Sequence, residues 1–342
     1  MDETLNEMDR IRGVFFGQLI GDALGARYEF KTAQEVVQMI QNDRQKDSFL
    51  PILGGGPFNM KPGQVTDDSE MALSLVDSLI RNKGFKQSDV AKSYVKWYES
   101  RPPDIGITTA TALKDNRELL EENKETEILE RIFKNVKKHN GESLSNGHLM
   151  RQSPLAIAFR NDTALMLDAA EKDTRLTHLQ QTAIDASAIY LLAIVGLIKG
   201  KSPQKVFAQL LDHSISLRNP VILGLLTAAG THAVPVKLPN GSETDGFTSK
   251  IGYLGVALQL AFHELIHANS FERGLENVIS RGGDTDTNGC IAASLLGARF
   301  GFSGIPQRWI EAVKSSKPRN AALTFLNLQD AEQTIQSLAS LS

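Results

Sequence analysis

Hydrophobic residues recur every three to four positions along most of the chain, which is the spacing of one face of an α-helix. Residues 88–100 show the pattern plainly, with Val90, Tyr94 and Trp97 apolar behind a Ser-Asp start. A helix beginning at Pro203 is indicated by Ser202 before it, since proline suits the first turn. Further helices are predicted for residues 125–141, 177–200, 289–300, 306–316 and the tail from 330.

Strand signals are weak by comparison. No segment alternates convincingly between apolar and polar residues, and no series of hairpin turns or fixed-period repeats appears. No low-complexity linker divides the chain, although residues 51–65 and 233–247 are rich in glycine and proline. We therefore expect an all-α protein with one domain over residues 1–342, in which residues 1–9 form a mobile N-terminal segment.

Composition narrows the class of protein. The 342 residues are 41% hydrophobic and carry a formal net charge of −3, so no basic surface indicates nucleic acid or an anionic membrane. Cys290 is the single cysteine, which excludes an intramolecular disulfide and is typical of a reducing compartment. The start resembles no targeting peptide, and the apolar run at 188–198 is too short to span a bilayer. These features favour a cytoplasmic protein.

Two acidic clusters stand at predicted helix starts far apart in sequence. "TDDSE" places Thr66, Asp67 and Asp68 before one apolar helix, and "DTDTN" places Asp284 and Asp286 before another. Either cluster alone is more simply explained as helix capping. Capping needs only one such residue, however, so the repetition suggests that the two clusters converge in the fold.

Hard oxygen ligands of this kind suit Mg²⁺, Mn²⁺ or Ca²⁺ rather than zinc. Four aspartates in one pocket would repel strongly without cations, and two divalent ions would neutralise them. Two ions about 3.5–4 Å apart can hold neighbouring substrate oxygens and activate water. The sequence thus predicts a binuclear metal site.

At these residues the chain resembles the ADP-ribosylglycohydrolase family, and the resemblance extends over nearly its whole length. "TDDSEMAL" and "GGDTDTNG" are similar to the two metal-binding motifs of that family. Five further segments follow in the expected order: "GQLIGDALGARYEF", "PPDIGITT", "NGHLMRQSP", "THLQQTAIDASA" and "GYLGVALQLAF". Each motif is weak alone, but the ordered set is specific.

The resemblance implies an orthogonal all-α bundle, two Mg²⁺ or Mn²⁺ ions, and cleavage of ADP-ribose from a modified side chain through an oxocarbenium-like transition state. By position it implies catalytic acids at Glu29 and Asp104. The implied metal ligands are Thr66, Asp67, Asp68, Asp284, Asp286 and Thr287, and the implied substrate-binding residues are Gly106, Asn146, Gly147, His178 and Tyr253.

The chain departs from the family pattern at a few places. Ile107 replaces the usual asparagine of the D-I-G loop, which removes a polar contact to the distal ribose or the leaving group. Ser145 stands where glycine is common, and His148 and Leu149 replace smaller residues, so the pocket wall is bulkier. Ala257 stands where threonine is frequent. These changes bear on substrate choice more than on the metal site.

Two other functions remain open at the level of sequence. His263, Glu264 and His267 match H-E-x-x-H, the zinc-binding helix of many peptidases, but no third ligand follows at a suitable distance. A polar helix face is the commoner explanation of that match. The fold could also serve as a non-catalytic module that binds ADP-ribose or a protein, and Ile107 keeps that alternative open.

The interpretation favoured by the sequence is a Mg²⁺- or Mn²⁺-dependent hydrolase of ADP-ribosylated protein. ADP-ribosyl-arginine is the first choice of substrate, because the D-I-G loop resembles the arginine-directed bacterial branch, and ADP-ribose is the expected product. The expected setting is regulation of a metabolic enzyme or protection against an ADP-ribosylating toxin or transferase. No nucleic-acid or membrane partner is expected.

Overall fold

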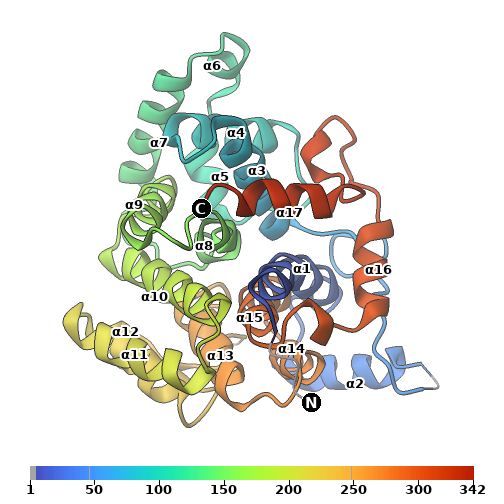
Figure 1. The fold of residues 1–342 in the computed structure, drawn as a ribbon. Coiled ribbons are helices and arrows are strands. Elements are labelled where there is room, and N and C mark those ends of the chain that lie inside the picture. Colours follow the sequence, from blue (N-terminus) through green and yellow to red (C-terminus); the bar gives the residue numbers. More distant parts are fainter. Residues whose placement is uncertain (1–4, 46, 248) are drawn as a thin grey trace.

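Two helices from opposite ends of the chain form the centre of the protein. The computed structural model describes residues 5–45, 47–247 and 249–342. Helices α1 (Glu7–Gly25) and α15 (Thr285–Phe300) lie side by side in the middle of the molecule, and the other helices surround them (Figure 1). The N-terminal and C-terminal thirds of the chain are therefore joined in the core, which a local reading of the sequence does not reveal.

Glycines at every fourth position of α1 let it touch the backbone of α15. A Cβ atom added at Gly13 would lie 2.1 Å from the carbonyl oxygen of Gly297, and one added at Gly21 would lie 2.3 Å from that of Gly289. Contacts of this kind occur only where side chains are absent. Because the two helices run antiparallel, the C-terminal end of α1 meets the N-terminal end of α15, where the second acidic cluster lies.

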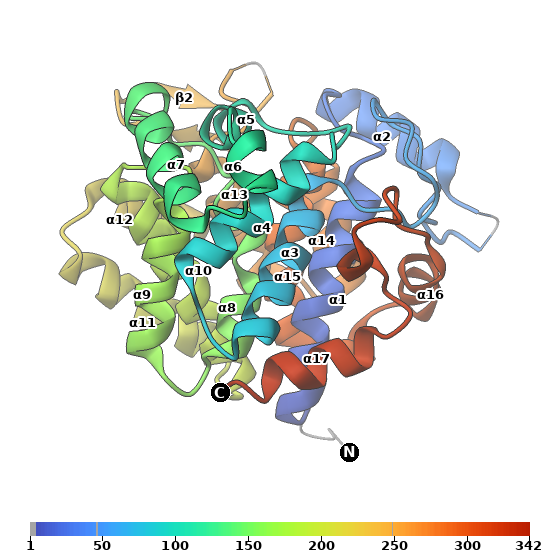
Figure 2. The same cartoon turned by 90° about the horizontal axis from the view of Figure 1, so that it is seen from above.

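The surrounding helices fall into three groups along the sequence (Figures 1 and 2). The first group contains α2 (Ala33–Asp43), α3 (Asp67–Asn82), α4 (Gln87–Glu99), α5 (Ile107–Leu113), α6 (Arg117–Glu121) and α7 (Glu125–His139). The second contains η1 (Leu149–Arg151), α8 (Ser153–Ala158), α9 (Thr163–Thr174), α10 (Gln181–Ile198), α11 (Pro203–Ser216), α12 (Pro220–Ala229), α13 (Leu254–His267) and α14 (Phe271–Ile279). The third contains η2 (Phe302–Gly304), α16 (Gln307–Ser315), η3 (Thr324–Leu326) and α17 (Ala331–Ala339).

The all-α class predicted from the sequence is confirmed, with one small addition. Strands β1 (Val236–Lys237) and β2 (Glu243–Thr244) pair antiparallel, with Val236 opposite Thr244. Each strand has two residues, which is too short for an alternating pattern to appear in the sequence. In Figure 2, β2, α5 and α2 lie on the same upper side of the molecule, which is the side of the functional cavity described below.

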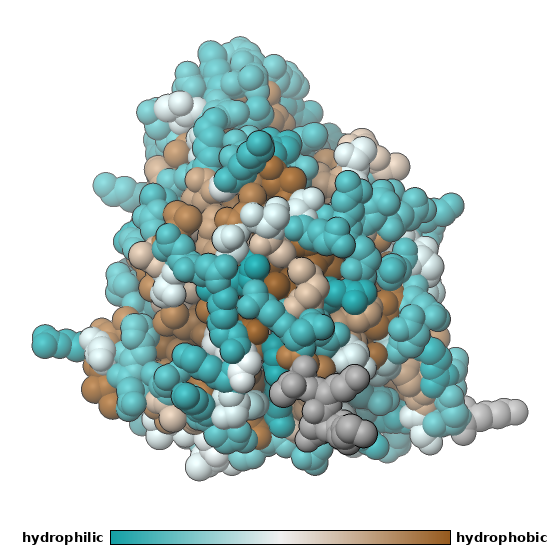
Figure 3. Space-filling view, in the orientation of Figure 1, coloured by the Kyte–Doolittle hydropathy of each residue, from teal (hydrophilic) through white to brown (hydrophobic). Residues whose placement is uncertain are grey.

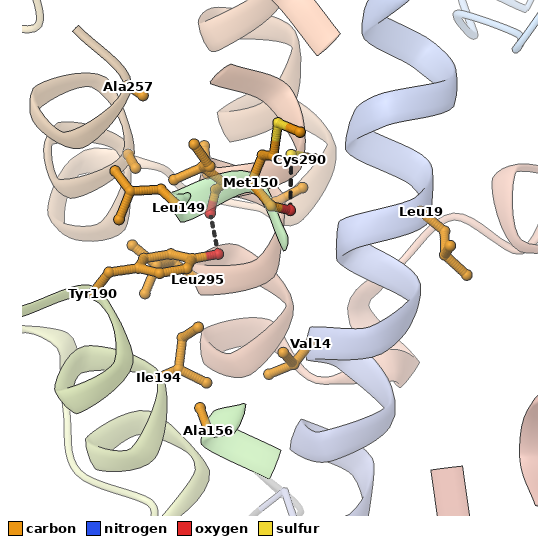
Figure 4. Close-up of a cluster of buried hydrophobic side chains, with 14 of the residues drawn as sticks. Val14, Leu19, Leu149, Met150, Ala156, Tyr190, Ile194, Ala257, Cys290 and Leu295 are labelled. Carbon is orange, nitrogen blue, oxygen red and sulfur yellow. Dashed lines mark hydrogen bonds between the residues drawn. The ribbon is translucent and has the colours of Figure 1, made fainter. Parts of the chain in front are cut away.

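A continuous apolar core joins the central pair to α10 and η1. Figure 4 shows Val14 of α1, Leu295 of α15 and Ile194 of α10 among these buried side chains. The Tyr190 hydroxyl donates to the carbonyl oxygen of Ile291 at 3.3 Å, so the polar end of this buried ring is satisfied. The face in Figure 3 is mostly hydrophilic with scattered hydrophobic patches, as usual for a protein surface.

Helix α10 is long and apolar enough to cross a membrane by length and composition, which the short run at 188–198 did not indicate. However, 72% of it is buried inside the protein. It packs against α8, α9, α11 and α15. Its apolar character is therefore explained by its place in the core.

Some helix boundaries differ from those predicted. Helix α15 begins at Thr285 rather than residue 289, so the second acidic cluster forms its first turn. Helix α10 begins at Gln181, because the Thr177 and His178 amides donate back to Thr174 and close the preceding turn. At the start of the expected mobile segment, residues 1–4 lie outside the described residues. Helix α1 already begins at Glu7, capped by Asn6.

Candidate functional site

The two acidic clusters face one cavity. Asp67 is the first residue of α3, Asp286 lies in the first turn of α15, and Asp284 is the residue immediately before that helix. All three line a cavity of about 780 Å³ together with Glu29, which follows the C-terminal end of α1. Carboxylate oxygens of Glu29, Asp284 and Asp286 all lie within 4.8 Å of one another. The convergence predicted from sequence is therefore present.

Asp22 organises the first cluster, although no role was predicted for it. Its carboxylate accepts from the Thr66 amide and hydroxyl, each at 2.9 Å, and from the Ser69 amide at 3.0 Å. The Thr66 hydroxyl also contacts Asp68 at 2.9 Å. Asp22 thus ties α1 to the start of α3. Its place in "GDALG" could have indicated a role, but an aspartate within a helix is ambiguous without its neighbours.

The second cluster is held from the opposite wall. Asn146, which was expected to bind substrate, lines the cavity, and its Nδ2 donates to Asp284 Oδ2 at 2.7 Å. The Thr287 amide donates to Asp286 Oδ1 at 2.9 Å, and Thr287 lines the cavity. Thr66 and Asp68 are buried beneath the cavity lining, and the Cys290 thiol donates to Asp68 at 3.3 Å.

Crowding and burial strongly perturb these acids. Burial, reinforced by Asp284, raises the pKa of Glu29 to about 9, and burial with repulsion from Asp22 raises the pKa of Asp67 to about 7. Burial raises the pKa of Asp22 to about 6. Hydrogen bonds from Thr66 and Ser69 stabilise the ionised carboxylate and so limit this rise. The pKa values of Asp68, Asp284 and Asp286 are raised as well, chiefly by burial.

The donor set fits divalent hard cations. Glu29 Oε2 is buried and has no hydrogen-bond partner, and carboxylate oxygens of Asp284 and Asp286 lie within 4.8 Å of the Glu29 carboxylate. A ligand that supplies positive charge would satisfy it and lower the repulsion. Among the described residues, Glu29, Asp284 and Asp286 are the one group of three acidic, histidine or cysteine side chains whose ligand atoms all lie within 4.8 Å of one another. Glu29, which the sequence placed beside the metals, is therefore close enough to Asp284 and Asp286 to contact an ion held there.

The D-I-G loop forms another wall of the cavity. Asp104 lines it, and burial with repulsion from Asp67 and Glu29 raises the pKa of Asp104 to about 11. The Gly106 amide donates to Asp67 Oδ2 at 3.4 Å, which connects the loop to the first cluster. Ile107 lies at the cavity mouth and is 83% exposed, so the departure from asparagine puts an apolar side chain where a ligand enters.

The remaining predicted substrate residues divide into two groups. Gly147 and Tyr253 line the cavity, and the Tyr253 hydroxyl is buried without a partner. His178 does not line the cavity. It is fully buried behind Ser145, and its Nε2 lies 2.9 Å from the Ser145 hydroxyl. The sequence could not show this, because the depth of a side chain depends on the tertiary packing of its helix.

The H-E-x-x-H segment has a structural role. His263 Nδ1 donates to the Ala229 carbonyl at 2.9 Å, and His267 Nε2 donates to that of Gly230 at 3.2 Å. These carbonyls end α12, where the helix leaves its own acceptors unpaired. Glu264 is buried and accepts from Asn277. No third acidic, histidine or cysteine ligand stands with the pair in the described part of the chain.

Known proteins resemble the chain over most of its length. The sequence profile of the ADP-ribosylglycohydrolase family matches residues 3–339. The ADP-ribosyl-[dinitrogen reductase] glycohydrolase of Rhodospirillum rubrum is 28% identical over 302 residues, which cover 88% of this chain and 89% of that protein. The ADP-ribosylarginine hydrolase Tri1 of Pseudomonas putida (strain GB-1) is 26% identical over 318 residues, which cover 91% of this chain and 76% of Tri1.

The fold is shared with a solved structure. A chain described as an ADP-ribosylglycohydrolase-related protein complex superposes with a TM-score of 0.73 at 24% identity. The match covers 98% of this chain and 99% of that one.

Proposed function

The chain belongs to the ADP-ribosylglycohydrolase family, and from this premise we propose that it removes ADP-ribose from modified protein side chains, with ADP-ribosyl-arginine as its main substrate. The observation that carries the proposal is the meeting of Asp67 with Glu29, Asp284 and Asp286 at one cavity. Buried carboxylates that repel one another are costly to a fold, so their retention at a cavity indicates a function. The cavity volume is within the range usual for small-molecule sites.

The site is proposed to hold two Mg²⁺ or Mn²⁺ ions through Asp67, Asp68, Asp284 and Asp286, with Thr66, Thr287 and Glu29 beside them. Such ions supply a Lewis acid that can hold ribose hydroxyls and increase the acidity of water. Glu29 is placed to orient water or accept its proton at the unpartnered Oε2. Asp104, on the opposite loop, is placed to stabilise positive charge on the sugar or to protonate the leaving group.

The charge of the cavity supports a cationic leaving group. Lys250 is the one cation among the described residues that line it, whereas six residues contribute carboxyl groups: Glu29, Asp67, Asp104, Glu142, Asp284 and Asp286. Three of these acids, Asp67, Asp284 and Asp286, would hold the two divalent ions together with the deeper Asp68, and the ions would offset those four charges. The other three carboxyl groups outnumber Lys250, so this wall is net negative when they are ionised and attracts a guanidinium more strongly than a neutral hydroxyl group. Similarity to the ADP-ribosylarginine hydrolase Tri1 also supports the choice of arginine.

A release assay tests the proposal. Purified protein is incubated with ADP-ribosylated arginine, serine and DNA-base substrates in Mg²⁺, Mn²⁺ or EDTA, and free ADP-ribose is measured. We expect metal-dependent release from arginine, with a loss of at least about 100-fold in Asp67→Ala and Asp286→Ala. Asp185→Ala is the matched control, because Asp185 is also buried but bonds to Gln181 and Asn219 away from the cavity.

Three results would redirect the assignment. Preferential release from serine or DNA-base substrates would reject arginine specificity and keep the family activity. Binding of ADP-ribose without turnover of any substrate would favour a non-catalytic module. Peptide cleavage that requires zinc and His263 would favour the peptidase.

A further inference from the structure

A line of buried polar groups connects a cation to the cavity wall. Arg151 is fully buried, and its Nε and Nη2 donate to Asp173 Oδ2 and Thr177 Oγ1, each at 3.0 Å. The Thr177 hydroxyl lies 2.9 Å from His178 Nδ1, and His178 Nε2 lies 2.9 Å from the Ser145 hydroxyl. Ser145 lines the cavity and is the only one of these five residues that does. Arg151 therefore reaches a ligand only through its neighbours.

The protons along this line have two complete arrangements, which differ in the tautomer of His178. In the first, Thr177 donates to Nδ1, and Nε2–H donates to Ser145. In the second, Nδ1–H donates to Thr177, Thr177 donates to the Thr174 carbonyl, and Ser145 donates to Nε2. His178 is neutral in both, because burial and the nearby His148 and Arg151 lower its pKa well below the usual value.

The contacts favour the first arrangement. The Thr177 hydroxyl is 2.9 Å from His178 Nδ1 but 3.4 Å from the Thr174 carbonyl oxygen. That carbonyl already accepts from the Thr177 and His178 amides, so it does not need the hydroxyl. The guanidinium of Arg151 also favours a lone pair over an N–H on the near side of the ring.

The arrangement decides what Ser145 offers to the cavity. When Ser145 accepts from His178, its own proton is free to point to the Thr108 hydroxyl, 3.2 Å away, or to an oxygen of a ligand. When Ser145 donates to His178, it has no proton left to offer. Thr108 and Ser143 line the same wall with their hydroxyls 3.0 Å apart, so a ligand oxygen would meet a hydroxyl cluster there.

We propose that Arg151 is a positioning residue for substrate binding: through Thr177 it keeps the proton of His178 on Nε2, so that the Ser145 hydroxyl donates to an oxygen of the ADP-ribosyl group. This inference rests on the proposed function for the identity of the ligand. It makes Ser145, which departs from the glycine common in the family, a determinant of affinity in this chain.

The test combines ring ¹⁵N NMR of His178 with calorimetric Kd values for ADP-ribose. Thr177→Val keeps the Arg151–Asp173 pair but breaks the connection to the ring, and Ser145→Ala removes the final donor. We expect the Nε2–H tautomer in the wild type and a mixture of tautomers in Thr177→Val. Ser145→Ala should weaken ADP-ribose binding by about five- to tenfold, the contribution of one hydrogen bond. Thr177→Val should weaken it by only about twofold when the two tautomers are equally populated, and the double variant should be no weaker than Ser145→Ala.

Controls separate positioning from general stability. Arg151→Lys should produce a mixture of His178 tautomers, as Thr177→Val does. If Arg151→Lys fails to fold, Thr177→Val still tests the proposal. Thr227→Val removes a hydroxyl that bonds within α12, and it should change neither measurement. An Nδ1–H tautomer in the wild type, or losses that multiply in the double variant, would overturn the proposal. Normal ADP-ribose binding without turnover of ADP-ribosyl-arginine would reject the proposed function alone.

Discussion

Metal binding to this site should release protons, and the number can be estimated from the structure. At pH 7 a carboxyl group with a pKa of about 9, as for Glu29, is almost fully protonated, and one with a pKa of about 7, as for Asp67, is half protonated. A divalent ion binds the ionised forms, so these two residues alone should release about 1.5 protons when the site fills. Affinity should then rise by at least about tenfold per pH unit between pH 6 and 8.

Calorimetry in buffers of different protonation enthalpy measures this release directly, since the slope of the observed enthalpy against the buffer enthalpy is the number of protons. Glu29→Gln should lower the number by about one. Glu276→Gln should leave it unchanged, because Glu276 is a buried acid paired with Arg44 outside the cavity. A slope of zero with Mg²⁺ and Mn²⁺ throughout pH 6–8 would refute the reasoning, because it would mean that the carboxylates are already ionised without the metal.

Three further outcomes follow from the contacts described above. Gly21→Ala should lower the free energy of unfolding by about 3 kcal/mol or more, measured by urea denaturation, because its Cβ would lie 2.3 Å from the Gly289 carbonyl oxygen. Asp22→Asn should lower the free energy of unfolding by about 1–3 kcal/mol, since an amide NH₂ cannot accept from Thr66. It should also weaken Mn²⁺ binding measured by calorimetry, and unchanged binding would contradict the role of Asp22. His263→Ala should cost about 1 kcal/mol in thermal unfolding and leave ADP-ribose release unchanged, whereas loss of that activity would connect the histidine pair to the site.

The sequence contains enough information to predict the helices and the meeting of the two acidic clusters. Helical periodicity is local, and the ordered motifs of the family supply the long-range pairing of Asp67 with Asp284. The sequence did not settle the role of Asp22 or the buried position of His178, because both depend on how deeply one helix packs against another. The exposure of Ile107 was also unpredictable, since its side chain could have turned inward to fill the cavity.

The central helix pair explains how the chain can tolerate so many buried acids in one place. The first turns of α3 and α15 carry their acids at helix N-termini, where each dipole contributes about 0.3–1 kcal/mol. That stabilisation is smaller than the repulsion among several carboxylates a few ångströms apart. Protons that stay on the carboxyl groups, or bound cations, must therefore offset the rest of the repulsion. The glycine contacts between α1 and α15 hold Glu29 and Asp286 close together whether protons or metal ions offset the repulsion. A rigid backbone of this kind keeps the carboxylates near one another before an ion arrives, so binding has to displace protons rather than assemble the site.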